Sequence, residues 1–212
     1  MKIGIIGAGF VGRAVAKLAI KAGHQVMLSN SRGPQTLFSL KPMIGCEIGT
    51  ATEAAAFGDI VVIAVPLTAL GQLPVALLAG KPIIDAVNYY PERDGQVTEL
   101  DQQRTTTSEY LAGFLPQSKI TKAFNAIQMT DLESDGLPAA DPARRALPLA
   151  GDDEETKKRI IALYDAFGFD AVDVGALSEG WRFQRAMPSY CVRMTRRELE
   201  GVLAEARRPE PV

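Results

Sequence analysis

The feature that most constrains the fold of this chain is a glycine-rich loop directly after an apolar N-terminal run. The loop reads Gly7-Ala8-Gly9-Phe10-Val11-Gly12; it follows Lys2–Ile6 and opens a helical pattern that extends to Lys21. Gly7 permits the tight turn out of a strand, Gly9 lets phosphates approach the backbone, and Gly12 lets the helix pack closely on the sheet. The pattern therefore predicts a strand–turn–helix unit that binds a dinucleotide.

Short β-branched runs alternate with helical stretches along the rest of the chain, which is typical of a parallel α/β sheet. We expect a Rossmann-type, doubly wound α/β fold with a mostly parallel sheet and a small C-terminal α/β lobe. The expected strands are Lys2–Ile6, Gln25–Ser29, Cys46–Gly49, Ile60–Val65, Pro82–Ala86, Lys119–Lys122, Ala146–Ala150 and Ala171–Val174. The expected helices are Val11–Lys21, Pro34–Leu40, Thr52–Phe57, Leu67–Leu78, Asp153–Phe167 and Ser189–Ala206.

Two polar, proline-containing stretches, Asn88–Thr107 and Thr130–Arg145, read as long connections, and long connections in compact domains are often functional. We expect residues 1–125 to form the nucleotide-binding domain. Residues 126–212 are expected to form a small lobe that ends in a helix and does not fold independently, with Arg207–Val212 as a frayed tail.

The end of the second expected strand indicates which dinucleotide binds. An NAD site usually has a carboxylate there for the ribose hydroxyls, whereas this chain has Ser29-Asn30-Ser31-Arg32. A guanidinium can hold a 2′-phosphate with two hydrogen bonds, and serine hydroxyls can complete the site, so we expect NADP(H). The expected cofactor-binding residues are Gly7, Gly9, Phe10, Val11, Gly12, Ser29, Asn30, Ser31, Arg32, Ala64, Val65, Pro66 and Asn88.

The chain resembles the NADP oxidoreductases that use the deazaflavin coenzyme F-420, together with their bacterial relatives. The resemblance covers almost the whole chain in order. The matching segments are Gly7–Gly12, Ser31-Arg32, Ala64–Pro66, Lys122–Asn125, Ala150–Asp153, Gly168–Asp173 and Gly175–Leu177. It implies a Rossmann domain that binds NADP(H), with the second substrate stacked against the nicotinamide, and it implies a homodimer. The amphipathic pattern of Ser189–Ala206 also favours a homodimer.

No acid–base group stands out, so no catalytic residue is assigned. The single histidine, His24, falls in the turn before the second expected strand, at the opposite edge of the sheet from the cofactor. Hydride transfer to a flavin-like ring needs little from the protein beyond stacking geometry and electrostatics, which favours coenzyme F-420 or a flavin as co-substrate. Lys122, read as a surface lysine at a strand end, and Tyr89 or Tyr90 remain possible acids for a carbonyl or imine substrate. The substrate-side candidates are Tyr89, Asn125, Trp181 and Phe183.

Composition narrows the possible partners. The 23 basic and 25 acidic residues give a net charge of −2, and no apolar run approaches the ~20 residues that span a bilayer. We therefore expect a small-molecule redox acceptor and neither nucleic acid nor membrane as partner, no metal, two free cysteine thiols that are buried, and a cytoplasmic protein.

Two other functions remain open. One is an NADPH-dependent imine or small carbonyl reductase, although the residues after Gly175 are few for the helical domain of such enzymes. The other is a non-catalytic NADP(H)-sensing domain that uses Asn88–Thr107 on a protein partner.

Overall fold

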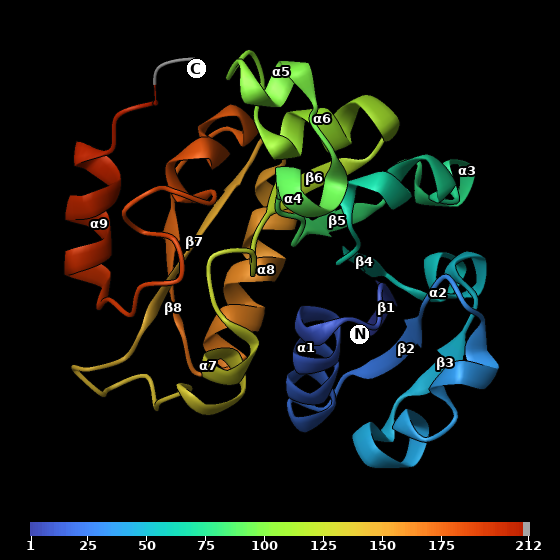
Figure 1. The fold of residues 1–212 in the computed structure, drawn as a ribbon. Helices are drawn as coiled ribbons and strands as arrows, with labels where there is room; N and C mark the ends of the chain where they lie inside the picture. Colours follow the sequence, from blue (N-terminus) through green and yellow to red (C-terminus); the bar gives the residue numbers. More distant parts are fainter. Residues whose placement is uncertain (210–212) are drawn as a thin grey trace.

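Eight strands form one sheet in the order β3-β2-β1-β4-β5-β6-β7-β8 in the computed structural model, which describes residues 1–209 (Figure 1). The strands are β1 Lys2–Ile6, β2 Gln25–Ser29, β3 Glu47–Gly49, β4 Ile60–Ile63, β5 Pro82–Asp85, β6 Lys119–Lys122, β7 Ala146–Gly151 and β8 Asp170–Asp173. Neighbouring strands are parallel except β6 and β7, which pair antiparallel. The Rossmann-type, mostly parallel sheet expected from the sequence is confirmed.

Helices cover both faces of the sheet. The α-helices are α1 Phe10–Lys21, α2 Ala51–Phe57, α3 Val75–Leu78, α4 Pro91–Asp94, α5 Thr98–Asp101, α6 Thr107–Phe114, α7 Met129–Ser134, α8 Glu154–Ala166 and α9 Arg196–Glu205. The other helical turns are η1 Pro34–Leu37, η2 Lys41–Gly45 (a π-helical turn), η3 Leu67–Gln72 and η4 Leu177–Phe183. Buried side chains of α1, α7 and α8 share one core cluster, and those of α2, η3, α3 and α6 share another.

The central strand shows why both faces are needed. All four residues of β4 are buried, as expected for a strand covered on both sides. Since successive side chains of a strand point to opposite faces, Ile60 and Val62 join the core cluster of α1, whereas Val61 and Ile63 join that of α2. The continuous apolar run thus holds the two helix layers on either side of the sheet.

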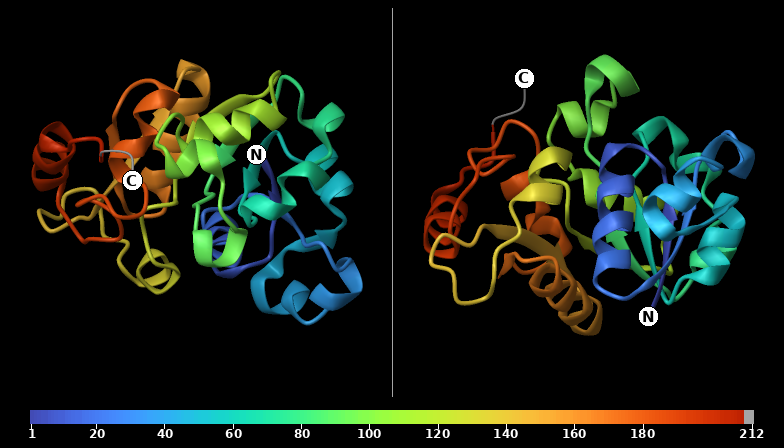
Figure 2. Two further views of the ribbon diagram at one scale, coloured as in Figure 1. Left: turned by 45° about the horizontal axis from the view of Figure 1, so that its top comes forward. Right: turned by 90° about the horizontal axis from the view of Figure 1, so that it is seen from below.

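Segments far apart in sequence meet on the α1 face. Helix α7 packs beside α1, where Lys17 and Glu133 form an ion pair with their Nζ and Oε2 atoms 2.8 Å apart (Figure 1). At the far end of the sheet, α9 lies away from the N-terminal βαβ unit in both views of Figure 2. The proposed boundary at residue 125 stays a prediction, because β7 and β8 continue the same sheet.

The single helix expected over Leu67–Leu78 is wrong. The chain instead forms η3, leaves helical geometry at Leu73 with ψ of 141°, and resumes as α3. Pro74 explains the break, because proline disfavours the helical conformation of the residue before it and lacks a backbone N–H. The expected helix Pro34–Leu40 is likewise only the single turn η1.

The last helix is shorter than the expected Ser189–Ala206. It begins at Arg196, where Thr195 and Glu198 form a capping box, and Cys191 before it has a φ of +58°. The buried side of α9, Leu199 and Leu203, packs on β7 and β8 of the same chain. Its amphipathic pattern is therefore explained without a partner subunit, and the homodimer stays a prediction.

The two expected long connections contain structure that the sequence reading missed. Asn88–Thr107 holds α4 and α5, and α6 follows directly; Thr130–Arg145 contains most of α7. The missed signal for α6 was the capping box of Thr106 and Glu109.

No helix in residues 1–209 has the length and apolar character needed to cross a bilayer. Residues 210–212 of the expected tail lie outside the described residues.

Candidate dinucleotide-binding site

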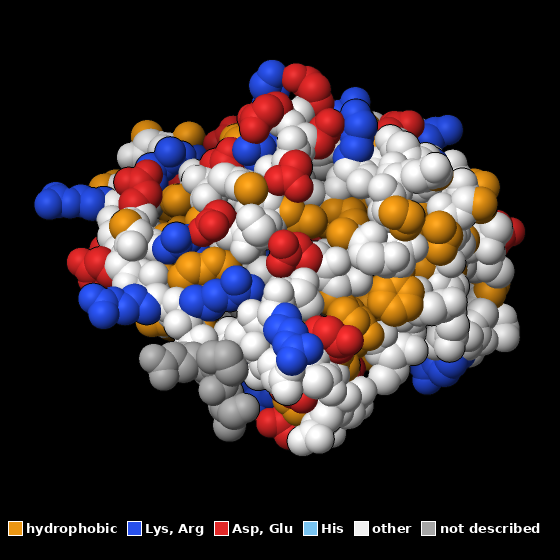
Figure 3. Space-filling view, turned by 90° about the horizontal axis from the view of Figure 1, so that it is seen from above, with side chains coloured by type: hydrophobic (Ala, Val, Ile, Leu, Met, Phe, Trp, Pro, Cys, Tyr) orange, Lys and Arg blue, Asp and Glu red, His pale blue; other side chains and the backbone are white. Residues whose placement is uncertain are grey.

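A cleft of about 430 Å³ opens at the carboxyl ends of β1, β2 and β4, where open α/β sheets bind ligands. Its lining comes from the glycine loop, the β2–η1 loop, the start of α2 and the β4–η3 connection. The lining residues are Ile6, Gly7, Ala8, Gly9, Phe10, Arg13, Asn30, Ser31, Arg32, Ala51, Ala64, Val65, Pro66, Ala69, Gln72 and Leu73. Seen from above, hydrophobic side chains gather on the half of the molecule that carries β1–β4, and charged side chains crowd the other half (Figure 3).

The glycine loop has the geometry expected from its sequence. Gly7 has a φ of +115°, and a Cβ there would lie 2.2 Å from the Ala64 carbonyl oxygen. A Cβ on Gly9 would meet nothing within 4 Å, so it would occupy open space of the cleft. Gly9 is also the N-cap of α1 and provides no side-chain cap, which leaves the first N–H groups of the helix for an anion. This cradle fits a pyrophosphate.

The β2–η1 loop is held in place by its own polar side chains. Asn30 Oδ1 accepts a hydrogen bond from the Arg32 backbone N–H at 3.0 Å, and Asn30 Nδ2 donates to Thr36 Oγ1 at 2.8 Å. Gly33, with a φ of +92°, makes the turn into η1, and Gln35 Nε2 donates to the Arg32 carbonyl oxygen. The backbone that carries Ser31 and Arg32 is therefore fixed before a ligand arrives.

The cleft has a positive lining. Its two charged side chains are Arg13 and Arg32, and no Asp or Glu lines it. The Arg32 guanidinium has no hydrogen-bond or ion-pair partner among residues 1–209, whereas Arg13 Nε donates to the Ala8 carbonyl oxygen at 2.7 Å. Sequence reasoning missed Arg13, although its place one residue after Gly12, in the first turns of α1, was a usable signal.

Not every residue expected to contact the cofactor lines the cleft. Ser29 is fully buried, and its hydroxyl donates to the Ile5 carbonyl oxygen of the neighbouring strand β1 at 2.9 Å. Val11 is half-buried and packs against the core cluster of α1. Gly12 does not line the cleft either, because it faces the Gly7 carbonyl oxygen. The remaining expected residues around the glycine loop, the β2 end and the β4 end do line the cleft: Gly7, Gly9, Phe10, Asn30, Ser31, Arg32, Ala64, Val65 and Pro66.

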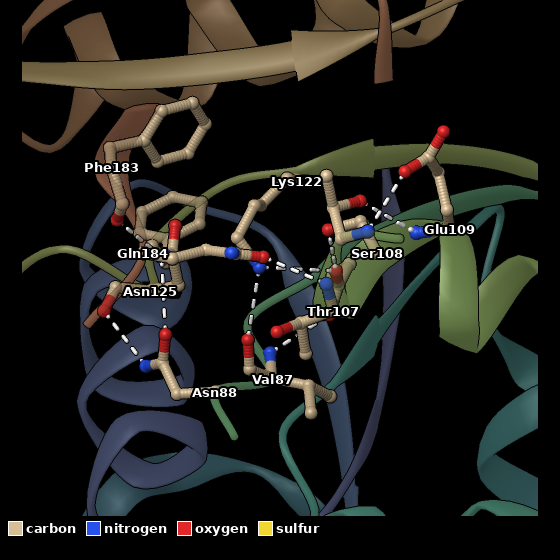
Figure 4. Close-up of polar contacts among 12 residues, drawn as sticks. Val87, Asn88, Thr107, Ser108, Glu109, Lys122, Asn125, Phe183 and Gln184 are labelled. Atoms are coloured by element: carbon tan, nitrogen blue, oxygen red, sulfur yellow. Dashed lines mark hydrogen bonds and ion pairs between the residues drawn. The ribbon is translucent and has the colours of Figure 1, made fainter. Parts of the chain in front are cut away.

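Asn88 and Asn125 form a pair of amides at the ends of β5 and β6 (Figure 4). Asn88 Nδ2 donates to the Asn125 carbonyl oxygen at 2.9 Å, and Asn125 Nδ2 donates to Asn88 Oδ1 at 3.2 Å. Asn125 Nδ2 also donates to the Phe183 carbonyl oxygen. Asn88 does not line the cleft, and Phe183 is fully buried in the core cluster of α9, so its ring does not face an open acceptor site.

The remaining substrate-side candidates, Tyr89 and Trp181, meet at a separate small pocket of about 100 Å³. The Tyr89 hydroxyl donates to Asp101 Oδ1 at 2.7 Å and accepts from the Val97 N–H, and burial with this carboxylate raises the pKa of Tyr89. Trp181 is 9% exposed, with the Arg182 guanidinium over its ring. Tyr89 and Trp181 are therefore held in packing roles.

Lys122 is not the surface lysine that its strand-end position indicated. Its side chain is fully buried, with Nζ 3.5 Å from Asp85 Oδ2 and donating to the Val87 carbonyl oxygen at 3.1 Å. Burial lowers the pKa of Lys122, against the opposing effect of the Asp85 carboxylate. Since parallel strands are covered on both faces, a side chain at the end of β6 can be enclosed by the elements that follow.

Other chemistry-bearing residues contribute little to the cleft. His24 lies in the turn between α1 and β2, and partial burial lowers its pKa. Both thiols are free; Cys46 is buried as expected, whereas Cys191 is only half-buried. In the described part of the chain, no three His, Cys, Asp or Glu side chains gather as metal ligands would.

Comparison with known proteins finds a family model that matches the part of the chain with this cleft. Residues 2–89, which carry the cleft, match the model of the family described as "NADP oxidoreductase coenzyme F420-dependent". The match covers less than half of the chain. It supports NADP(H) as the cofactor of the cleft and, for these residues, the resemblance drawn from the sequence.

Relatives extend the similarity beyond the family model. The chain is 28% identical to rat (Rattus norvegicus) metalloreductase STEAP3 over 197 residues, which is 90% of this chain and 38% of that protein. It thus spans little more than a third of the curated relatives it matches. Hypothetical protein SMa0349 of Sinorhizobium meliloti has a similar solved structure, with a TM-score of 0.78, 26% identity, and 92% and 95% of the two chains covered.

A second solved structure shows the same fold. It is a protein of Arthrobacter sp. FB24 whose suggested activity is that of an F420-dependent NADP reductase. The TM-score is 0.68 at 24% identity, and the match covers 83% of this chain and 85% of that chain.

Proposed function

We propose that this chain is an NADP(H)-dependent oxidoreductase that passes hydride between NADP(H) and coenzyme F-420 or a flavin. The glycine cradle suits the pyrophosphate, and Ser31 and Arg32 suit the 2′-phosphate. A guanidinium without a protein partner gains charge-assisted hydrogen bonds from a phosphate, whereas the carboxylate that an NAD site uses is missing from this cleft.

The choice of a flavin-like acceptor rests on one observation: the possible proton donors are either absent from the cleft or engaged in other contacts. The cleft is lined by no His, Lys, Tyr, Asp, Glu or Cys. The nearby candidates are engaged: Tyr89 is bonded to Asp101, the Tyr90 hydroxyl lies 2.5 Å from that of Tyr190, and Lys122 is enclosed.

This state suits a ring acceptor better than a carbonyl or imine. Reduction of a carbonyl or imine needs a positioned proton donor as well as hydride. When bound, NADPH supplies the hydride, and a flavin or deazaflavin ring accepts it with little help from side chains. The chain's own residues then have to bind and orient the two rings.

Two measurements test the proposal. Calorimetry with NADPH and NADH is expected to show micromolar binding of NADPH and much weaker binding of NADH; equal affinities would contradict the assignment of the 2′-phosphate. The second measurement mixes the protein with NADPH and either F-420, FMN or FAD. A fall in the nicotinamide absorbance of NADPH is expected, which would show turnover.

The same assay separates the rival functions. Turnover with a cyclic imine or a small carbonyl compound alone would instead identify an imine or carbonyl reductase. Tight NADPH binding without turnover on any acceptor would identify a sensing domain.

We also propose a homodimer, to be tested by light scattering on the purified chain.

A further inference from the structure

A fully buried ion pair lies beneath the ends of β5 and β6, outside the cleft. Lys122, Asp85 and Ser108 are all fully buried. Ser108 Oγ donates to Asp85 Oδ2, while Asp85 Oδ1 accepts from the Val87 N–H at 2.8 Å. Lys122 Nζ holds the carbonyl oxygen of the same Val87 (Figure 4). Asp85 and Lys122 thus bind the backbone N–H and the backbone carbonyl of Val87, the residue before Asn88.

These contacts are part of a closed ring. From Val87 the chain leads to Asn88, whose side chain exchanges hydrogen bonds with Asn125, and Asn125 donates to the Phe183 carbonyl oxygen at the end of η4. The next residue, Gln184, accepts from the Thr107 N–H at 2.8 Å, and Thr107 precedes Ser108 in α6. The ring therefore ties together β5, β6, α6 and η4 (Figure 4).

Burying the charged and polar groups of this ring costs free energy. Removing two charges from water costs several kcal/mol per ion, and their attraction repays this only with good geometry. The Asn125 side-chain oxygen is buried without a hydrogen-bond partner among residues 1–209, and Phe124 beside it has a φ of +61°. Unpaired buried acceptors and left-handed non-glycine residues cluster at functional sites. The buried ion pair, the unpaired Asn125 oxygen and the left-handed Phe124 are thus three unfavourable features around one amide pair.

The sheet order indicates what this amide pair faces. The cleft extends from Arg32 at the end of β2 to Pro66 after β4, and β5 is the next strand outward. In this fold, the dinucleotide lies across the point where the strand order reverses, with the nicotinamide half on the side of β4 and β5 when the 2′-phosphate lies at β2. Asn88 and Asn125 therefore follow the strands beyond Pro66, on the nicotinamide side.

We propose that Lys122 and Asp85 are positioning residues for hydride transfer: their buried pair fixes the backbone at Val87 and so holds the Asn88–Asn125 amide pair where the nicotinamide carboxamide binds. This inference rests on the proposed NADP(H)-dependent function. The pair acts through the backbone of Val87 and Asn88 and does not touch the phosphate end of the cofactor.

The test removes both charges together. The double variant Lys122→Met/Asp85→Asn leaves no unpaired buried charge, keeps the aliphatic chain that packs beside Gly180, and keeps an acceptor for Val87 N–H. The matched control is Lys157→Met/Asp173→Asn, which removes an ion pair between α8 and the end of β8 with Nζ and Oδ2 2.9 Å apart. In this pair the lysine is buried and the aspartate is exposed. Both variants are first compared with the wild type by thermal unfolding.

The readouts separate positioning from general stability. In the ring variant, kcat with the acceptor is expected to fall about 10- to 100-fold, the usual cost of a misplaced reactant, with the NADPH dissociation constant changed less than about twofold. The control variant is expected to keep its kcat even where its unfolding temperature falls. Equal kcat losses in both variants, or a matching loss of NADPH affinity, would overturn the inference.

A second readout needs no acceptor. In ¹⁵N spectra of the wild type, NADPH is expected to shift the Asn88 side-chain amide together with the backbone amides of Gly9 and Arg32. In the ring variant, only Gly9 and Arg32 are expected to shift as before. A wild type in which Gly9 and Arg32 respond and Asn88 does not would overturn the positioning role alone. Failure of all three to respond would overturn the proposed function as well.

Discussion

The Cβ that Gly12 lacks would lie 1.9 Å from the carbonyl oxygen of Gly7, inside the contact between α1 and the loop that precedes it. A Cβ on Gly9, which lies between them in the sequence, would meet nothing within 4 Å. Two glycines of one loop thus serve different purposes: Gly12 is required by packing, whereas Gly9 is required by the ligand.

Alanine substitutions at these two glycines are expected to separate folding from binding. Gly12→Ala is expected to lower the free energy of unfolding by about 1–3 kcal/mol or more, because the new methyl group meets backbone that has little room to move. Gly9 has a φ of −73°, which alanine adopts freely, so Gly9→Ala is expected to unfold like the wild type. It is expected to bind both NADPH and NADH about tenfold more weakly, equivalent to ~1.4 kcal/mol. Unfolding curves and calorimetry check this; wild-type affinity in Gly9→Ala would contradict the cradle.

The two arginines of the cleft are expected to have different effects on cofactor choice. Arg32→Leu is expected to weaken NADPH roughly 10- to 100-fold and to leave NADH unchanged, because hydrogen bonds to a charged group contribute about 1.5–3 kcal/mol. Arg13→Leu is expected to weaken both cofactors alike, since Arg13 sits beside the Ala8 carbonyl at the glycine loop. Calorimetry with both cofactors on each variant measures the ratio. A change of the ratio in Arg13→Leu would place the 2′-phosphate near Arg13 instead.

Ser29 and Ser31, at the end of β2 and just after it, test whether only the exposed serine contacts the cofactor. Ser31 is exposed and lines the cleft, whereas Ser29 is buried and bonded to Ile5. Ser31→Ala is expected to reduce the preference for NADPH over NADH. Ser29→Ala is expected to lower the free energy of unfolding by about 1 kcal/mol and to leave that preference unchanged. An altered preference in Ser29→Ala would mean that its hydroxyl reaches the cofactor after all.

The parts of the fold that could be predicted are those where local patterns and packing agree. Strands β1, β2 and β6 have the expected bounds. In β1 and β2 the apolar run ends at a turn glycine or a polar residue, which fixes the end of the strand. The cradle was predictable because each glycine has a steric reason that follows from the fold. The break at Pro74 was also predictable, because proline disfavours the helical conformation of the residue before it.

The errors at the site share one cause, which is tertiary burial. The types of Ser29 and Lys122 indicate solvent or ligand contact, yet both side chains are fully buried. Their polar partners lie on other strands or loops: Ile5 for Ser29, and Asp85 and Val87 for Lys122. The substrate-side role of Asn125 stays a prediction, but its hydrogen bond to Phe183, 58 residues further on, could not be foreseen. Such contacts leave no periodic signal in the sequence.

The last prediction concerns pH and the contact of α4 with the segment after η4. Glu92 forms a two-pronged ion pair with Arg185, with oxygen–nitrogen distances of 2.6 and 3.0 Å. Hydrogen bonding from Arg185 lowers the pKa of Glu92 from 4.5 to about 2. Because the folded-state pKa lies below the unfolded one, the pair stabilises the fold above about pH 4.5, and this contribution is lost as the pH falls toward 2.

Carboxyl-carbon NMR titration measures this directly. The Glu92 resonance is expected to titrate near 2 in the wild type and to return toward 4.5 in Arg185→Gln, because the neutral amide cannot replace the guanidinium charge. Glu53 provides a control, since its pKa is lowered by the Thr50 cap rather than by a cation and is expected to be the same in both proteins. A wild-type Glu92 that titrates near 4.5 would show that the ion pair is not maintained in solution.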